Sequence, residues 1–255
     1  LLKFNRPILV LGDPGQLPPI DGTGFFTSRT PDHFLTEIHR QALDSPIIKW
    51  ATAVRTGKGL GGRAMRDGDC EVIKRGFTPK GQTAPLHLYS AYGLTADQTI
   101  CGLNATRHTF NAKLRQLRFL GSPVGQPIMG DKLICLKNDH EVVLLNGGMW
   151  QVISEPKLFI DSWEMKVKSL DLEDFSVDIN VPAKFFLGQG STLTKEELFE
   201  KDQFDFGYAI TCHKSQGSQW DRVFIYNENY VFRENAARWL YTAITRAAKS
   251  VVIVL

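Results

Sequence analysis

The sequence lacks any long hydrophobic run. Its longest aliphatic stretches are Ile8–Leu11 and Val251–Leu255, whereas a helix that crosses a bilayer needs about 20 apolar residues. The first seven residues also lack a basic start followed by an apolar stretch, which is the pattern of a secretory signal. The sequence therefore predicts neither a membrane span nor a secretory signal.

Cysteine is equally scarce. The four cysteines are scattered and show no C-x-x-C spacing, so they predict neither a zinc site nor a disulfide framework. We expect no metal ligands in these residues, and the cysteine usage fits the reducing interior of a cell. The cysteines are Cys70, Cys101, Cys135 and Cys212.

The net charge of +3 conceals an uneven distribution along the chain. Residues 49–118 hold 12 Lys and Arg against four acids, which gives this block +8 and leaves −5 for the rest. A concentrated basic block is either the footprint of a polyanionic partner or a solvated face. The charge pattern alone leaves both interpretations open.

The order of apolar segments predicts an α/β fold of about two domains, at ~150 residues per domain. Pro7–Leu11 ends in Gly12 and is typical of a buried parallel strand that opens into a loop. From about residue 120, short apolar segments between turns predict a small inserted antiparallel barrel. The α/β pattern then resumes, with a strand expected over 206–211 and a helix over 236–247.

Polar residues follow the first predicted strand, in the loop 12–20. Ligands of open α/β sheets bind beyond the carboxyl ends of the strands, and Gln16 lies in such a loop. Its amide can accept from a water and donate to a phosphate oxygen, as a sensor of a terminal phosphate does. The alternative is a Pro/Gly turn with a solvated glutamine.

Two arginines follow apolar segments. Arg40 comes just ahead of a helix that Ser45 and Pro46 are expected to begin, where it would offer a planar fork to phosphate or form a surface ion pair. Arg246, on the last helix, is a second candidate for stabilising a transferring phosphoryl group. For Trp239, in the same helix, we favour core packing.

The segment 211–221 is rich in groups that donate to phosphate. It follows a predicted strand and combines hydroxyls, a histidine and a lysine with loop amides. Gly217 would let the backbone approach a ligand closely. We expect this segment to contact phosphate groups.

Taken in order, the segments 12–20, 35–41, 211–221 and 241–247 resemble motifs III, IV, V and VI of superfamily 1 helicases. The variants are those of the RecD/Dda type, which moves 5′ to 3′ on single-stranded DNA. Cys101–Arg107 resembles the motif that follows motif IV, and Gly130–Lys132 resembles the start of the SH3-like insertion. The resemblance implies a RecA-like motor domain of the P-loop NTPase class, with helices on both faces of a parallel sheet and an inserted SH3-like β-barrel.

The resemblance also implies a division of the chain. Residues 1–40 would end a first RecA-like domain. Residues 41–119 and 206–255 would form the second, and residues 120–205 the inserted barrel with its linker.

The resemblance implies roles for individual residues. Gln16 would couple the γ-phosphate of ATP to the nucleic acid. Arg40 and Arg246 would be arginine fingers, and Gly217 would line the nucleotide. Gln219 stands where many relatives have a Glu near the ribose. The residues implied to meet single-stranded DNA are Asn104, Arg107, Thr211, His213 and Lys214.

Two motifs that ATP hydrolysis needs are absent: G-x-x-x-x-G-K-[ST] and a downstream Asp-Glu pair for magnesium. Gly57-Lys58 has Thr52 in place of the first glycine and Gly59 in place of Ser/Thr. We therefore expect a piece of a longer protein, inactive alone, whose Mg²⁺ ligands lie upstream. The implied cofactors are ATP and Mg²⁺. The implied partners are single-stranded DNA, duplex junctions and the missing N-terminal RecA-like half.

Two alternatives stay open. The first alternative to a helicase fragment is a single-stranded nucleic-acid-binding module of helicase descent that hydrolyses no ATP. The second is a helicase subunit of an exonuclease complex. No nuclease carboxylate cluster is visible in the sequence, so cleavage would come from elsewhere. The resemblance places the protein in the cytoplasm of a bacterial or phage-infected cell.

Overall fold

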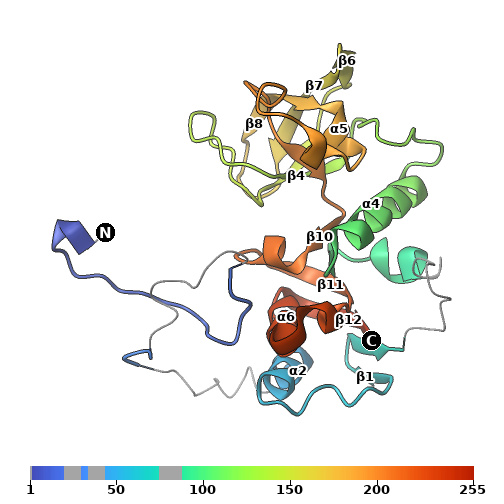
Figure 1. Ribbon diagram of the computed structural model, residues 1–255. Helices are drawn as coiled ribbons and strands as arrows, with labels where there is room; N and C mark the ends of the chain where they lie inside the picture. The colour runs from blue at the N-terminus through green and yellow to red at the C-terminus, as the bar shows by residue number, and fades with distance from the viewer. Residues whose placement is uncertain (1, 20–29, 34–43, 75–87) are drawn as a thin grey trace.

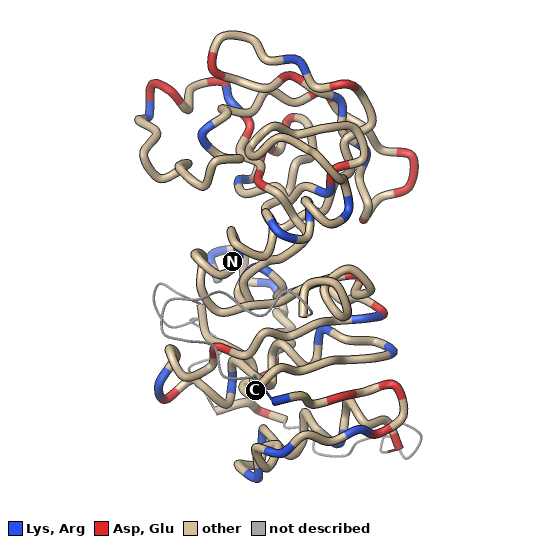
Figure 2. The backbone as a smooth tube through the Cα atoms, turned by 90° about the vertical axis from the view of Figure 1, so that its right-hand side faces the viewer, with Lys and Arg blue, Asp and Glu red and all other residues tan. Residues whose placement is uncertain are grey.

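The computed structural model describes residues 2–19, 30–33, 44–74 and 88–255, which form two lobes (Figure 1). Each lobe is built on its own six-stranded sheet. Figure 2 shows the lobes one above the other, with Lys and Arg interspersed with Asp and Glu in both. Within the described ranges, no helix combines the length and apolar character that a bilayer crossing requires.

The core sheet is mostly parallel, with the strand order β1-β2-β12-β11-β3-β10. Only β1 runs antiparallel, in a hairpin with β2. The neighbours from β2 to β10 are all parallel, so their carboxyl ends share one edge. The strands are β1 (Met65–Asp67), β2 (Cys70–Ile73), β3 (Gln98–Cys101), β10 (Ala209–Thr211), β11 (Trp220–Tyr226) and β12 (Ala247–Val254).

Helices cover both faces of this sheet, because alternate residues of its strands point to opposite sides. Val223 of β11 packs in one apolar cluster with α2 (Pro46–Arg55) and α6 (Ala236–Ile244). Its neighbour Phe224 packs in a second cluster with α4 (Asn104–Arg118). The α/β class with helices on both faces is therefore confirmed. The short helical turns are η1 (Leu2–Phe4), η2 (Tyr89–Gly93), η4 (Cys212–Ser215) and η5 (Asn229–Asn235).

The second lobe is an antiparallel sheet formed by the part of the chain that follows α4 and precedes β10 in the sequence. Its strand order is β6-β7-β5-β4-β9, and β8 pairs with β7. This part of the chain is therefore a separate β unit, as the spacing of apolar segments predicted. Its elements are β4 (Lys132–Cys135), β5 (Met149–Val152), β6 (Lys157–Phe159), β7 (Ser162–Ser169), β8 (Ser176–Pro182), α5 (Ala183–Phe186), η3 (Gly190–Thr192) and β9 (Phe204–Phe206).

The single strand predicted over 206–211 is wrong. β9 ends at Phe206 in the second sheet, and β10 begins at Ala209 in the core sheet. The side-chain amide of buried Asn111 donates to the carbonyls of Phe206 and Ala209 at 2.9 and 3.1 Å, and its oxygen accepts from Ala209 N at 2.7 Å. A Cβ at Gly207 would lie 2.9 Å from the backbone of Leu133. The chain changes sheets here because Asn111 replaces the lost ladder bonds and glycine permits the close approach.

A buried ion pair joins the two lobes. Arg115 of α4 donates from Nε to both carboxylate oxygens of Asp131 at 2.9 Å. The hydroxyl of Tyr208, beside β10, donates to the same carboxylate at 2.8 Å. Asp131 immediately precedes β4, so this network fixes the place where the second lobe begins.

The buried strand predicted over Pro7–Leu11 is also wrong. These residues are irregular and exposed, with 85% of Leu9 and 85% of Leu11 accessible. A central strand needs neighbours that satisfy its N–H and C=O groups, and none of the described strands pairs with this segment. Its apolar side chains consequently have no sheet on which to pack.

Candidate functional site

The loop 13–17 docks on helix α6. The carboxylate of Asp13 accepts from the backbone N–H of Gly15 at 2.9 Å and from the hydroxyl of Tyr241 at 2.7 Å. Burial, together with this acceptor, raises the pKa of Tyr241 to about 12. The guanidinium of Arg55 lies 6.0 Å from the centre of the Tyr241 ring. The loop is thus held by a side chain that helix α6 presents.

Leu17 anchors the same loop from both sides. Its N–H donates to Oγ1 of Thr242 at 2.8 Å, and its carbonyl accepts from Nε2 of Gln216 at 2.8 Å. Its side chain is only 5% exposed and belongs to the apolar cluster of α2 and α6. Three of the segments singled out in the sequence therefore meet at one residue.

Gln16 lies between these two anchors and is half-buried. Its side-chain amide is 3.5 Å from Asp13, which is too long for a strong hydrogen bond. The backbone around Gln16 is therefore fixed while its amide is held loosely. This combination suits a side chain that reorients toward a ligand.

Arg246 is half-buried just beyond the end of α6, and its guanidinium contacts only neutral acceptors. It donates to the carbonyls of Thr242 and Ser218 at 3.2 and 3.0 Å and to the hydroxyl of Thr245 at 3.2 Å. Burial lowers its pKa, and the nearby charge of Asp13 opposes that shift. Across the described residues Arg246 has no ion pair. A positioned guanidinium with no counterion is suited to a phosphate group.

Gly217 and Gln219 lie on the loop that runs from β10 to β11. Gly217 has φ +87° with open space around it, so its backbone is accessible and glycine is the residue that adopts this conformation without strain. Gln219 is exposed. The loop begins beyond the carboxyl end of β10 and passes Gln216, which holds Leu17.

The carboxyl edge of the core sheet brings together most of the predicted DNA contacts. Thr211 of β10 lies opposite Cys101 of β3 in parallel register, so the loops that follow both strands leave the same edge. Asn104 is exposed in the first turn of α4. Thr211, His213 and Lys214 are all partly exposed.

His213 and Lys214 are held by neighbouring side chains. The ring of His213 lies 5.8 Å from that of Phe232, and burial lowers the pKa of the imidazole. The ammonium of Lys214 donates to Oδ1 of Asn146, in the second lobe. Burial, with a smaller contribution from the charge of Arg107, lowers the pKa of Lys214. This edge therefore has contributions from both lobes.

Arg107 lies apart from the exposed set. It pairs with Asp205 at 2.9 Å, and the two side chains are 12% and 5% exposed. Arg107 also contacts Nε2 of His108 at 3.1 Å. In this structure the buried carboxylate of Asp205, on β9, neutralises the charge of Arg107. The ion pair therefore connects α4 to the second lobe.

Glu228 is a residue of this edge that no sequence pattern singles out. Its carboxylate accepts from the N–H groups of Gly102 and Leu103 at 2.8 and 2.9 Å and from the hydroxyl of Thr106 at 2.6 Å. It therefore satisfies orphan N–H groups at the start of α4. More than 120 residues separate Glu228 from each of these partners, so no local pattern signals the contact.

Arg40 lies outside the described residues. Among the residues that the structure does describe, no group of three His, Cys, Asp or Glu side chains is arranged to hold a metal ion.

Comparisons with known proteins found a matching family model and a related sequence. Residues 206–254 match the UvrD-like helicase C-terminal domain. The chain is 27% identical to the ATP-dependent RecD2 DNA helicase of Deinococcus radiodurans, over 94% of this chain and 31% of that protein.

Two solved structures share the fold. The Pif1 helicase from Bacteroides, in complex with ADP-AlF3 and single-stranded DNA, is 18% identical, with a TM-score of 0.53 over 95% of this chain and 60% of that one. The Pif1 helicase from Candida albicans is 16% identical, with a TM-score of 0.53 over 95% and 62%. The chain thus spans about a third of the RecD2 helicase and about three fifths of the Pif1 chains.

Proposed function

Because this chain contains a UvrD-like helicase C-terminal domain and is a homologue of the RecD2 DNA helicase, we propose that it is the C-terminal motor part of an ATP-dependent DNA helicase. The helicase translocates 5′ to 3′ on single-stranded DNA and unwinds duplex DNA. Residues 41–119 and 206–255 form its second RecA-like domain and residues 120–205 an SH3-like insertion, except that Phe206, the last residue of β9, lies in the sheet of the insertion. Residues 1–40 belong by sequence to the end of the first RecA-like domain.

One observation carries the proposal: the loop 13–17 is bound to α6 and to the β10–β11 loop at the same time. Leu17 accepts from Gln216 and donates to Thr242. This anchoring holds the backbone of Gln16 on the domain that carries Arg246. A loop that senses a terminal phosphate and an arginine that stabilises its charge belong together in this arrangement.

The residues present fit ATP in part. Arg246 has neutral acceptors only, and Gly217 leaves its backbone open; both suit phosphate oxygens. Arg40 is proposed as the second finger. ATP, bound with Mg²⁺ whose ligands lie outside this sequence, supplies the free energy of hydrolysis. This chain contributes the groups that sense and stabilise the terminal phosphate.

The β10–β11 loop connects that region to the proposed DNA contacts. It begins at Thr211 on the carboxyl edge of β10 and passes Gln216 before it reaches Gly217. A displacement of the anchored loop 13–17 therefore acts on the segment that bears His213 and Lys214. Such coupling would change the grip on successive DNA phosphates as the two domains close.

The DNA contacts are tested with this chain and a fluorescent single-stranded oligonucleotide in an anisotropy titration. Lys214→Gln should weaken binding several-fold and reduce the slope of log K against log salt by about 0.7, the value for one phosphate contact on a single strand. Lys195→Gln, at an exposed position of the second lobe, is the matched control and should change neither quantity. Equal behaviour of the two variants would remove Lys214 from the interface.

The motor role is tested in a protein that joins this chain to the upstream half with the phosphate loop. Arg246→Ala should lower DNA-stimulated ATP hydrolysis by ~10³-fold or more while DNA binding survives. Retention of near-normal hydrolysis would remove Arg246 from the finger role. Absence of a phosphate loop upstream of Leu1 in the open reading frame would favour the binding-module alternative.

A further inference from the structure

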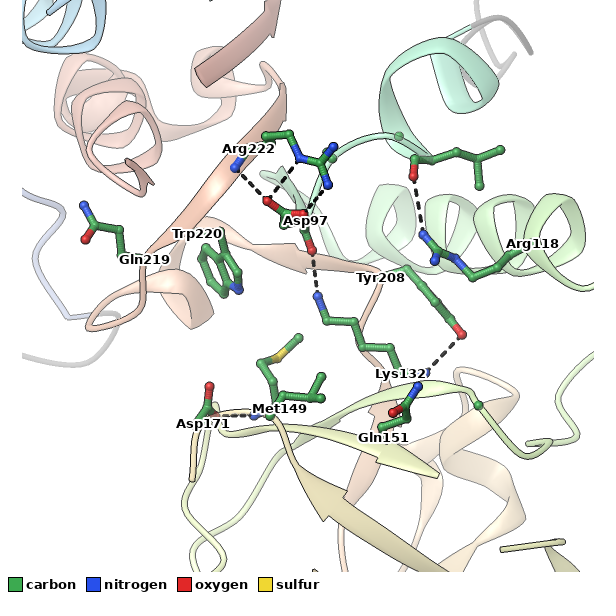
Figure 3. Close-up of a pocket in the computed structure, with 15 residues that line it drawn as sticks. Asp97, Arg118, Lys132, Met149, Gln151, Asp171, Tyr208, Gln219, Trp220 and Arg222 are labelled. Atoms are coloured by element: carbon green, nitrogen blue, oxygen red, sulfur yellow. Dashed lines mark hydrogen bonds and ion pairs between the residues drawn. The ribbon is translucent and has the colours of Figure 1, made fainter. Parts of the chain in front are cut away.

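A cavity of about 440 Å³ lies between the two lobes (Figure 3). Its size falls within the ~300–1,000 Å³ of small-molecule sites. One wall comes from the amino ends of β3 and β11 in the core sheet, and the other from β4 and β5 in the second sheet. The cavity is therefore at the opposite end of the parallel strands from Thr211, where β10 ends.

Two cations face this cavity without a counterion. The ammonium of Lys132 donates to the carbonyl of Asp97 at 2.8 Å and to Oε1 of Gln98 at 2.7 Å, both neutral acceptors. The guanidinium of Arg118 lies 5.6 Å from the centre of the Tyr208 ring and 3.4 Å from the carbonyl of Leu94. In the described parts of the chain, neither cation forms an ion pair.

The two cations repel one another. Burial lowers the pKa of Lys132 to about 8, and the charge of Arg118 contributes to that shift. Like charges held around a partly desolvated space are costly unless an anion lies between them. The positions of these two side chains therefore favour a negatively charged ligand.

The carboxylates around the cavity are already engaged. Asp97 accepts from the backbone N–H of Arg222 at 2.9 Å and from its guanidinium at 2.7 and 3.3 Å. Asp171 accepts from the N–H of Met149 at 2.7 Å. Neither forms an ion pair with Lys132 or Arg118, although the charges of both favour the protonated form of Lys132. Because Asp97 is paired with Arg222, Asp171 alone opposes the two cations, and the lining keeps a net positive charge.

An aromatic ring flanks the charged part of the cavity. Trp220 begins β11 and is partly exposed, and Figure 3 shows its indole beside the open space. A flat, accessible indole is a platform on which a planar ring stacks. The backbone N–H of Trp220 donates to the carbonyl of Arg246 at 2.9 Å, so the cavity adjoins the residue proposed as an arginine finger.

We infer that this cavity binds a nucleotide, with its phosphate between Lys132 and Arg118 and its base against Trp220. The nucleotide is either free or one unit of a nucleic-acid strand, because both present the same phosphate and planar ring. Neither Gln16 nor Arg246, the proposed phosphate contacts of ATP, lines the cavity, whereas Gln219, which the resemblance places near the ribose, does.

Calorimetric titration of this chain with AMP at low salt tests the inference. Arg118→Gln should weaken AMP binding tenfold or more, because a charge-assisted contact to the phosphate is lost. Arg63→Gln, at an exposed position outside the cavity, should leave the affinity unchanged. Arg118 is itself exposed, so its replacement does not threaten folding.

Arg246→Gln separates the cavity from the proposed ATP contacts. Retained AMP binding in this variant supports the inference. Loss of binding in Arg246→Gln together with full binding in Arg118→Gln would overturn it, as would the absence of AMP binding to the unaltered chain.

A short oligodeoxyadenylate distinguishes the two sources of the nucleotide. An Arg118-dependent affinity that exceeds that of AMP identifies a strand, and an Arg118-dependent affinity for AMP alone identifies a free nucleotide.

Either ligand should bind less tightly at pH 9.5 than at pH 7.5, because Lys132 loses its proton in this interval. An affinity independent of pH would remove Lys132 from the site. The charged and titratable groups that face Lys132 are Asp97, Arg118, Asp171, Tyr208 and Arg222.

Discussion

Replacement of Asp131 by Asn should destabilise the protein strongly. Asp131 is fully buried, and its two oxygens accept from Arg115 Nε, from the N–H of Ile128 at 2.8 Å and from the hydroxyl of Tyr208 at 2.8 Å. Asparagine keeps the shape but leaves the buried guanidinium of Arg115 without a counterion and places an NH₂ group against donors. Removal of one partner of a buried ion pair costs about 3–5 kcal/mol, a large share of the ~5–15 kcal/mol that stabilises a typical domain.

Urea unfolding followed by circular dichroism measures this cost. With a slope of about 2 kcal/mol per molar urea, Asp131→Asn should lower the midpoint by about 1.5–2.5 M. Tyr208→Phe removes one hydrogen bond to the carboxylate and should cost less, about 1.5–3 kcal/mol. Asp174→Asn breaks an exposed pair with Lys168 and should cost at most about 1 kcal/mol.

The double variant Arg115→Leu with Asp131→Leu completes the experiment. Because this apolar pair removes both buried charges together, it should be more stable than Asp131→Asn alone. The reasoning would be refuted by a midpoint for Asp131→Asn within error of that for Asp174→Asn, or by a double variant less stable than the single one.

Three further predictions concern individual contacts. Thr242→Val leaves the buried N–H of Leu17 unpaired, which should cost about 1–3 kcal/mol and speed hydrogen exchange at that amide; unchanged exchange there would contradict the anchoring. Glu228→Ala should cost about 0.5–2 kcal/mol through the lost cap of α4, with faster exchange at the amide of Gly102 as the readout. The pKa of Lys132 is lowered to about 8 from 10.5, so between these values the unfolded chain binds more protons and the free energy of unfolding should rise with pH. Lys132→Met, measured by urea unfolding across pH 8 to 10.5, should flatten that rise.

Features set by local sequence were predictable. The residues Asp44, Ser45 and Pro46 with apolar residues at helical spacing predicted α2, and the same reasoning applied to α6, although its end lies at Ile244 rather than at residue 247. These signals depend on φ fixed by proline and on periodicity of 3.6 residues, whereas Ser45 makes no side-chain cap hydrogen bond. All of them operate within a few neighbours along the chain.

Features set by partners that are distant in the sequence were not predictable. The run 206–211 appeared as one strand, because nothing in those six residues shows that Asn111 will hold the backbone between two sheets. Arg107 has the residue type of a phosphate contact, yet the carboxylate of Asp205 takes up its charge. For the same reason Glu228 escaped notice, since its partners are the start of a helix far away in the sequence. A single sequence shows which polar and charged groups need hydrogen-bond or ion-pair partners, but it does not identify those partners.

The loop 13–17 shows why a boundary in sequence and a boundary in packing differ. Its motif belongs to the end of one proposed domain, but Leu17 is buried in the apolar cluster of the other. Burial of a leucine contributes about 1.5–3 kcal/mol, and its two hydrogen bonds, one buried and one part-buried, contribute about 0.5–1.5 kcal/mol each. Separation of the loop from α6 and Gln216 therefore costs about 2.5–6 kcal/mol, so the loop moves with the lobe that holds the core sheet. The hinge between the proposed domains must then lie outside residues 13–17. In the proposed mechanism, Gln16 would therefore approach a bound phosphate as part of the body that carries Arg246.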